Sequence, residues 1–456
     1  MSNTLRYFRQ PLSLAGSVLA TTSAVLFLVV FLADLFGLHS NPYIGILFFL
    51  VLPGIFVVSL LLIPLGAWLA RRREHAGLPV SQLHWPRLDL NDPIQRRSVF
   101  IFAVLTLANV VIVSLAAYRG VEYMDSVQFC GATCHTVMKP EYTAYQDSTH
   151  SRVACVQCHI GAGATWFAKS KLSGTRQLFA VAFNTHSRPI PSPVKELRPA
   201  RDTCETCHWP EKFHGDKIQR VYEYGEDEKN TETLTTLQVH VGGGSERLGI
   251  AQGIHWHMNV ANQVEYIATD DKRQVIPWVR VKDRFGNVRE YSAEGVTDEQ
   301  LAKGERRTMD CMDCHNRPSH AIAATPERAV NELMARGDIP KTLPFIRREA
   351  VKALKVEYPS QDAAEREISR ALREFYRASD PRTYMGSRQD VEKAVQATTA
   401  IYRRNVFPEM KVQFGTYPNN IGHMDFPGCF RCHDDYHKSK AGKTISQDCE
   451  TCHKVE

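Results

Sequence analysis

The chain has 456 residues and a formal net charge of +6, and it contains 12 cysteines and 18 histidines. That length is enough for several structural units. Residues 1–118 hold eight arginines, no lysine and four acidic residues, whereas the rest of the chain is close to neutral. A basic surface of the kind that binds nucleic acid is therefore not expected.

Three long apolar runs occupy the first part of the chain. They cover residues 14–38, 43–70 and 98–118, and each is long enough to cross a bilayer as a helix. A buried core helix is the alternative, but three runs almost without charge favour membrane helices. No small-residue cleavage site follows the first run, which indicates an uncleaved anchor. Residues 1–118 are thus predicted to form a membrane module with three transmembrane helices.

The arginines orient this module. Arg6 and Arg9 precede the first run and six more lie within residues 71–97, whereas the loop at residues 39–42 has no lysine or arginine. The positive-inside rule then places the N-terminus in the cytoplasm. Three crossings put everything after Tyr118 outside, so we predict a multi-pass protein of a bacterial cytoplasmic membrane with its larger part in the periplasm.

A Cys-x-x-Cys-His motif recurs in the exported part. Five copies have this spacing, and the first copy, CGATCH, has one extra residue between its cysteines. The six copies use all 12 cysteines. In chain order they consist of Cys130, Cys134 and His135; Cys155, Cys158 and His159; Cys204, Cys207 and His208; Cys311, Cys314 and His315; Cys429, Cys432 and His433; and Cys449, Cys452 and His453.

This spacing is typical of c-type haem attachment. Two thiols add across the vinyl groups of one haem, and the histidine that follows binds the iron from one side. Zinc sites, thioredoxin-like pairs and structural disulfides are the alternatives, but none of them requires a histidine after every second cysteine. We therefore predict six covalently attached haem c groups.

The rest of the exported part shows three compositions, which predict a mixed fold of helix, loop and strand. Residues 119–215 contain the first three motifs, and residues 216–305 contain short alternating runs with turn signals, typical of β-hairpins. Residues 306–456 contain helical patterns and the last three motifs. We expect helices and loops to pack around the haems, with the hairpins as an insertion.

Residues 163–183 read as an amphipathic helix between the second and third motifs. They combine bulky apolar residues with lysine and arginine, which suits a membrane surface. A helix that packs on a haem is the alternative. The residues in question are Trp166, Phe167, Lys169, Lys171, Arg176, Phe179 and Phe183.

Nine histidines outside the motifs and the membrane module are candidates for the second iron ligand. Nine candidates for six irons favour haems with two histidine ligands, hence electron transfer rather than catalysis at an open iron. The favoured candidates are His150, His255, His257, His320, His423 and His437, and the less favoured are His186, His214 and His240. At the first motif, Met138 is either an iron ligand or a residue that packs on the porphyrin.

A membrane helix followed by CGATCHTVMKPEYTAYQDSTHSRVACVQCHIG resembles the NapC/NirT family of membrane-anchored multihaem cytochromes c over residues 98–215. The resemblance implies oxidation of menaquinol or ubiquinol at the outer membrane surface and electron transfer to periplasmic reductases or cytochromes. It also implies that His150 is an iron ligand and that Lys171 belongs to the quinol site.

The chain departs from the family pattern near that site. The family has a carboxylate about two turns after the lysine, but Gln177 stands here, so Glu141 or Asp147 is the expected proton acceptor. The chain also has three predicted membrane helices instead of one, and more haem motifs than the four-haem members. Met138 follows the motif histidine by three residues instead of two.

These features predict a membrane-anchored cytochrome that takes electrons from quinol and passes them to periplasmic partners. Two other functions remain open: an electron conduit that is fed by another membrane protein, and a terminal reductase. The reductase is disfavoured because all six motifs keep their histidine.

Overall fold

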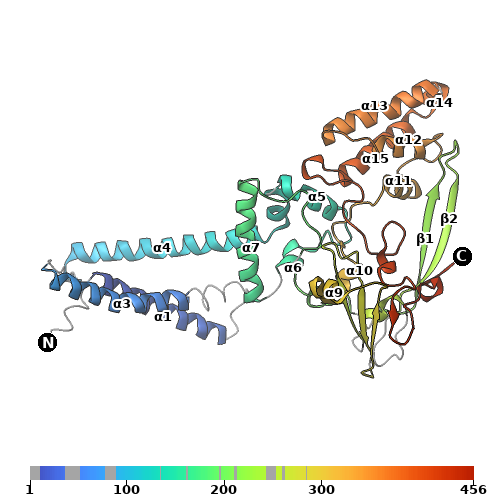
Figure 1. Cartoon of the computed structure of the whole chain (residues 1–456). Helices are drawn as coiled ribbons and strands as arrows, with labels where there is room; N and C mark the ends of the chain where they lie inside the picture. Colours follow the sequence, from blue (N-terminus) through green and yellow to red (C-terminus); the bar gives the residue numbers. More distant parts are fainter. Residues whose placement is uncertain are drawn as a thin grey trace. The chain divides into compact units, whose positions relative to one another are not determined.

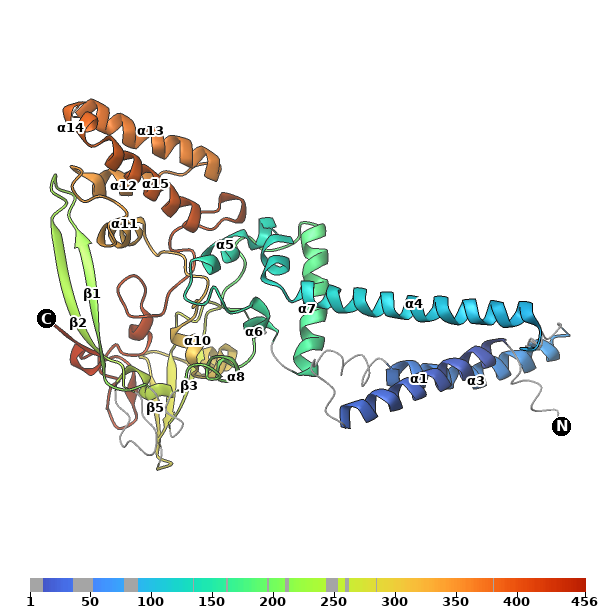
Figure 2. The same ribbon diagram turned by 180° about the vertical axis from the view of Figure 1, so that it is seen from behind.

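The computed structural model describes residues 11–35, 52–77, 89–133, 135–160, 163–194, 197–209, 213–242, 253–258, 262–283, 285–379 and 381–456. The chain divides into two compact units (Figures 1 and 2). The first consists of residues 1–122 with 161–173, and the second consists of residues 123–160 with 174–456.

The first unit is helical over its described residues. Its main helices are α1 (Pro11–Leu35), α3 (Leu52–His75) and α4 (Pro93–Met124). Helices α1 and α3 lie side by side, and small residues let them approach closely. A Cβ atom at Gly66 would lie 2.7 Å from the backbone nitrogen of Ser13, whose hydroxyl donates to the carbonyl of Ile63 at 2.8 Å. Contacts of this kind are common between helices in membranes.

One helix of this unit has the length and composition of a membrane span. Residues Gly54–His75 form a helix long and apolar enough to cross a bilayer, with a mean hydropathy of 1.9. Within the described residues it is the single candidate, and Pro11–Leu26 is a shorter apolar helix. The first two predicted spans fall partly on residues 36–51, which lie outside the described residues. The module of three membrane helices therefore stays a prediction.

Two antiparallel sheets belong to the second unit. The smaller has the order β1-β2-β8 and the larger has the order β6-β3-β4-β5-β7. The strands are β1 (Asp216–Tyr224), β2 (Glu232–His240), β3 (Gln263–Ala268), β4 (Trp278–Lys282), β5 (Val288–Ser292), β6 (Glu305–Thr308), β7 (Lys438–Ser439) and β8 (His453–Val455). Strands β3, β4 and β5 lie on the alternating runs and turns that the sequence indicated. The mixed helix-and-strand class is thus confirmed.

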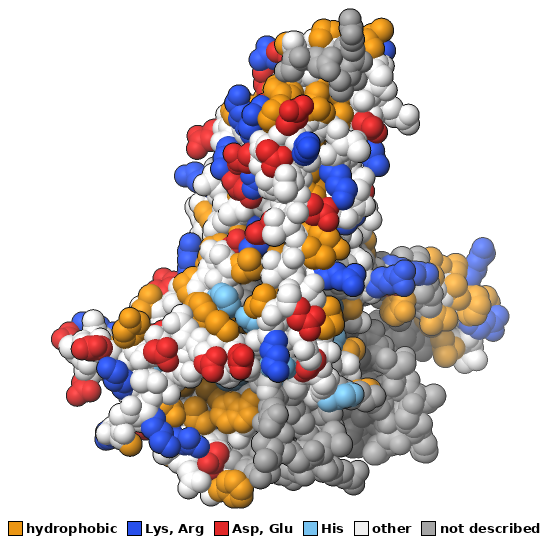
Figure 3. Space-filling model, turned by 90° about the vertical axis from the view of Figure 1, so that its right-hand side faces the viewer, with side chains coloured by type: hydrophobic (Ala, Val, Ile, Leu, Met, Phe, Trp, Pro, Cys, Tyr) orange, Lys and Arg blue, Asp and Glu red, His pale blue; other side chains and the backbone are white. Residues whose placement is uncertain are grey.

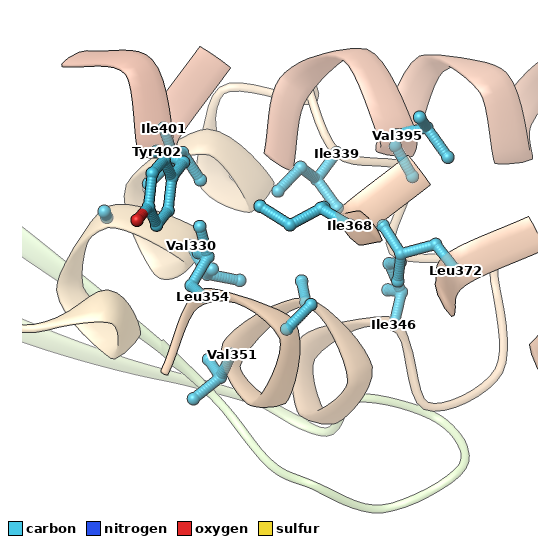
Figure 4. Packing of buried hydrophobic residues seen from close by; sticks show 14 of the residues in the cluster. Val330, Ile339, Ile346, Val351, Leu354, Ile368, Leu372, Val395, Ile401 and Tyr402 are labelled. Carbon is cyan, nitrogen blue, oxygen red and sulfur yellow. The ribbon is translucent and has the colours of Figure 1, made fainter. Parts of the chain in front are cut away.

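Five helices of the second unit form its largest hydrophobic core (Figure 4). Ile346, Ile368 and Leu372 are fully buried there. Thr325 begins the first of these helices, because its hydroxyl accepts a hydrogen bond from the backbone N–H of Arg328 at 3.2 Å. The helices are α11 (Pro326–Ala335), α12 (Ile346–Leu354), α13 (Gln361–Ser379), α14 (Pro381–Gly386) and α15 (Arg388–Asn405).

Segments that are distant in the sequence join these elements into one unit. Strand β2 pairs with β8 near the C-terminus, and β5 pairs with β7. The buried side chain of Asn230, after β1, donates to the carbonyls of Lys341 and Leu343 and accepts from the backbone of Arg347. The segment 216–305 therefore shares its packing with the residues that follow it.

Candidate haem-binding sites

The haem motifs lie on single helical turns. The second motif is helix α6 (Cys155–His159), and the fourth begins with α10 (Cys311–Cys314). The third follows α8 (Ala200–Cys204), and the last two lie on the 3₁₀ turns η7 (Gly428–Arg431) and η8 (Cys449–Thr451). Two cysteines three residues apart on one turn face the same side, as attachment to one porphyrin edge requires.

The first motif lies on a wider turn. It overlaps the π-helical turn η3 (Phe129–Thr133), and helix α5 (His135–Gln146) follows. A π-turn takes up one more residue than an α-turn, so this conformation accommodates the extra residue between the cysteines. Cys134 lies outside the described residues.

Each of the five other motif histidines faces a histidine from elsewhere in the second unit. The ring centres of these pairs are 5.9 to 6.4 Å apart. The pairs are His150 with His208 at 6.1 Å, His159 with His320 at 6.2 Å, His255 with His315 at 6.4 Å, His257 with His433 at 5.9 Å, and His423 with His453 at 6.1 Å.

This separation fits an iron held between two imidazoles. A metal–nitrogen bond in proteins measures about 2 Å, so two rings on opposite sides of one metal have centres roughly 6 Å apart. Direct packing of two rings does not require this spacing, and it recurs at five places. The residues present therefore fit haem groups with two axial histidines.

Hydrogen bonds at the other ring nitrogen support the same reading. The Nδ1 atoms of His255, His257 and His320 donate to the backbone carbonyls of Val241, Ile254 and Glu141, each at 3.0 Å. His433 Nδ1 donates to the carbonyl of Ser446 at 2.8 Å. Such bonds fix the tautomer and leave Nε2 free, which is the usual arrangement of metal-bound histidine.

Burial keeps several of these rings neutral. It lowers the pKa of His159, His255, His257, His315 and His320, and the paired ring adds to the lowering at His159, His257 and His315. A neutral imidazole has the lone pair that an iron ligand needs.

His437 does not take part in a pair. It is 2 % exposed, its Nδ1 bonds to the Asp434 carboxylate at 2.9 Å, and its Nε2 bonds to the carbonyl of Ile276 at 2.7 Å. Both ring nitrogens are therefore hydrogen-bonded, as in a buried structural histidine, and iron binding by His437 stays a prediction that this geometry does not support. His240 Nδ1 lies 3.0 Å from Asp216, and His214 is exposed.

His186 has a different environment. Both of its ring nitrogens are buried, and neither has a hydrogen-bond partner among the residues that the structure describes. Val181 and Ile190, on either side of it, pack against a hydrophobic cluster that includes Val137 of α5. His186 therefore lies on a segment that contacts the helix of the first motif.

Met138 shares helix α5 with His135, three residues further on. Residues three apart on a helix lie on the same face. Met138 therefore lies on the face of α5 that also carries position 135. The side chain of His135 itself lies outside the described side chains.

The four expected quinol-site residues have separate surroundings. The buried carboxylate of Glu141 accepts from Arg317 Nη2 at 2.7 Å and lies 3.7 Å from His320. Asp147 is exposed and lies 3.7 Å from Arg404. Lys171 and Gln177 both belong to helix α7 (Ala164–Ala182); Gln177 is exposed, and the side chain of Lys171 is outside the described ones.

Sulfur atoms of different motifs are neighbours. The free thiols of Cys155 and Cys130 form a hydrogen bond, and so do those of Cys204 and Cys311. The charge of Cys158 adds to the rise in the pKa of Cys204. Three further pairs are close enough for the charge of one thiolate to raise the pKa of the other thiol: Cys314 and Cys429, Cys314 and Cys432, and Cys429 and Cys452. Each contact joins motifs that are consecutive in the chain.

A buried arginine connects two motifs. Sequence reasoning missed it, because it occupies one of the two positions between the cysteines of CFRCH, where the motif requires no particular residue. Arg431 of the fifth motif is 9 % exposed and donates to the carbonyls of Gly428, Arg273 and Asp313 at 2.8, 2.8 and 2.6 Å. Asp313 belongs to the fourth motif and bonds to the buried hydroxyl of Tyr266. Burial raises the pKa of Asp313, and the charge of Asp310 adds to that rise.

Comparison with known proteins agrees with these sites. The N-terminal region of the NapC/NirT cytochrome c family matches residues 93–189. The cytochrome c-type protein ImcH of Geobacter sulfurreducens is 42 % identical over 100 % of this chain and 89 % of its own length. The cytochrome c-type protein NrfH of Wolinella succinogenes is 27 % identical over 24 % of this chain and 63 % of its own. No solved structure matches.

Proposed function

The chain belongs to the NapC/NirT cytochrome c family, and from this premise we propose that it oxidises membrane quinol and delivers the electrons through six haem c groups to periplasmic partners. Membership makes it a membrane-anchored multihaem cytochrome of electron transport with covalently bound haem. The five histidine pairs are the observation that carries the rest of the proposal.

In this proposal the protein holds each iron between a motif histidine and a distant one. The second to sixth motifs use His320, His150, His255, His257 and His423 in that order. Haem c, when bound, supplies one-electron transfer. Because sulfurs of consecutive motifs are neighbours, we propose that the attachment sites form a row in chain order.

The first motif has its own ligand in the proposal. His186 is favoured for the open side of that iron, because its ring nitrogens are buried and without a described partner. Met138 then packs beside the porphyrin on the side of His135.

We expect His186→Ala to produce one high-spin haem, because the iron at the first motif loses its second ligand. Met138→Leu, which conserves size, should leave the spin state unchanged and serves as the matched control. Electron paramagnetic resonance and the absorption of the oxidised protein measure the outcome. The opposite result, with a change in the leucine variant alone, would assign the ligand to Met138.

Quinol oxidation releases two electrons and two protons, so the site needs a proton acceptor near the membrane surface. Of the two candidate carboxylates, Asp147 fits better because it is exposed, whereas the carboxylate of Glu141 is held by Arg317. Lys171 remains the proposed residue that orients the quinol oxygen. Gln177 can donate or accept a hydrogen bond but cannot take up a proton at neutral pH.

The proposal is tested by adding a menaquinol analogue to the oxidised, purified protein and following the absorption of reduced haem. Rapid reduction that Lys171→Met slows at least tenfold supports quinol oxidation by this chain, and a variant of the exposed Lys440 is the control. Full reduction by dithionite with none by quinol would show a conduit that receives electrons from another protein. Residues 163–194 contain no acidic residue that could accept a proton from quinol, and this observation supports the second function, an electron conduit.

The charge pattern on the surface does not indicate whether a redox partner would be acidic or basic. The face shown in Figure 3 carries acidic and basic side chains intermixed, with histidines that reach the surface between them. Such a mixture gives no strong attraction for a partner of one sign.

A further inference from the structure

Helix α7 turns large apolar side chains outward. Leu172, Phe179 and Phe183 are 74 %, 57 % and 72 % exposed. They are spaced by seven and four residues, which puts all three on one stripe of a helix with 3.6 residues per turn. The rings of Phe179 and Phe183 stack with centres 6.3 Å apart.

Another side of this helix is partly buried. Ser170, Ser173 and Ala180 are half-buried there, as are Trp166 and Val181. A surface helix in water normally buries its apolar stripe and exposes its polar side chains. In α7 large apolar side chains are exposed while Ser170 and Ser173 are half-buried, an arrangement that favours an apolar medium outside the stripe.

The charged residues of the segment that carries the stripe are all basic. Residues 163–194 include no aspartate or glutamate, although they include Lys169, Lys171, Arg176 and Arg188. Lys169 and Arg176 are seven residues apart and lie along one edge of the stripe. The ammonium group of Lys169 lies 4.8 Å from the centre of the Trp166 ring. Long basic side chains at the edge of an apolar stripe can reach up to anionic headgroups.

We propose that α7 lies in the surface of the bilayer, with Leu172, Phe179 and Phe183 among the acyl chains and Lys169 and Arg176 on anionic phospholipid headgroups. The membrane anchor of the chain brings a bilayer within reach, and the exclusively positive charge complements anionic lipid. The inference rests on membrane anchoring and not on quinol oxidation, so a chain that fails to oxidise quinol can still satisfy it.

Spin labels on the full-length haem-loaded protein test this placement. Single cysteines replace Leu172 or Phe179, and Gly174→Cys is the matched control, since a Cβ there meets nothing within 4 Å and the position lies on the opposite side of the helix. The protein is placed in nanodiscs that contain phosphatidylglycerol, and collisions of each label with oxygen and with a water-soluble nickel complex are compared.

Lipid contact predicts a several-fold higher ratio of oxygen to nickel collisions at positions 172 and 179 than at 174. The double variant Lys169→Gln/Arg176→Gln should lower that ratio, as should replacement of phosphatidylglycerol by phosphatidylcholine. Equal nickel access at all three positions would overturn the proposal, because the stripe would then face water. Protection from both reagents would also overturn it, because another protein surface would then cover the helix.

Discussion

Replacing His423 by alanine is expected to convert the haem at the sixth motif from low spin to high spin. His423 faces His453 at 6.1 Å and is the ring that the structure offers to the far side of that iron. Its loss leaves a five-coordinate iron or one that binds water. The ring of Phe430, which stacks on His423 at 4.1 Å, has no atom that can replace the ligand.

Electron paramagnetic resonance of the oxidised protein measures this change as a new high-spin signal from one haem. Added imidazole should restore the low-spin state, because it fills the space that the side chain leaves. His214→Ala is the control, since His214 is exposed and belongs to no pair. An unaltered spectrum in the His423 variant would mean that the pair does not hold an iron.

Replacing Arg431 by methionine is expected to destabilise the second unit and to lower the reduction potentials at the fourth and fifth motifs. The guanidinium group is buried and bonds to the carbonyls of Gly428, Arg273 and Asp313. No carboxylate is among these partners, so its positive charge acts on its surroundings. Reduction adds a negative charge to a haem, and a nearby cation favours it.

The expected sizes follow from those contacts. Asn420 Nδ2 still donates to the carbonyl of Asp313 at 3.0 Å in the variant, so two carbonyls, those of Gly428 and Arg273, lose their donor. Each buried carbonyl left without a donor costs about 1–3 kcal/mol, so the expected loss is on the order of 2–6 kcal/mol of the free energy of unfolding. A tenfold change in electron occupancy corresponds to about 59 mV for a one-electron couple, and a shift of roughly that size is expected.

Chemical denaturation and a spectroelectrochemical titration measure the two effects. Arg431→Lys keeps the charge but loses part of the hydrogen bonding, so it should lose stability while its potentials change less. Arg370→Met is the surface control, because Arg370 pairs with Glu367 in solvent and should contribute below about 1 kcal/mol. Potentials that stay the same in the methionine variant would show that Arg431 is structural only.

The sequence predicted the family and the mixed fold class correctly, because both depend on local signals. Short motifs at fixed spacing, alternating runs and turn residues identify themselves without knowledge of the tertiary structure. The candidates for the second ligand could be narrowed to nine histidines by counting. The sequence did not allow us to predict which histidine faces which motif. His159 and His320, for example, come together only after the chain has folded.

His437 shows that closeness in sequence is a weak guide to which histidine faces which motif. Closeness in sequence to the fifth motif favoured it as a ligand, yet the structure pairs that motif with His257. What sets His437 apart from the paired histidines is that Asp434 and Ile276 hydrogen-bond to its two ring nitrogens, and the carbonyl of Ile276 comes from a distant strand connection. Arg431 was missed for a related reason: its partners Arg273 and Asp313 are far from it in the sequence.

The histidine pairs also bear on how the protein matures. An iron between His257 and His433, or between His159 and His320, would act as a cross-link between remote parts of the chain. Cross-links that close long loops restrict the unfolded chain most. Synthesis delivers the N-terminal part first. The motif at His159 can therefore receive its thioether bonds early, while its final coordination waits for the segment that carries His320. Covalent attachment and final coordination are thus separate events. Chains that end before His423 should still form the thioether bonds of the first motifs, but they cannot form the loop between His423 and His453.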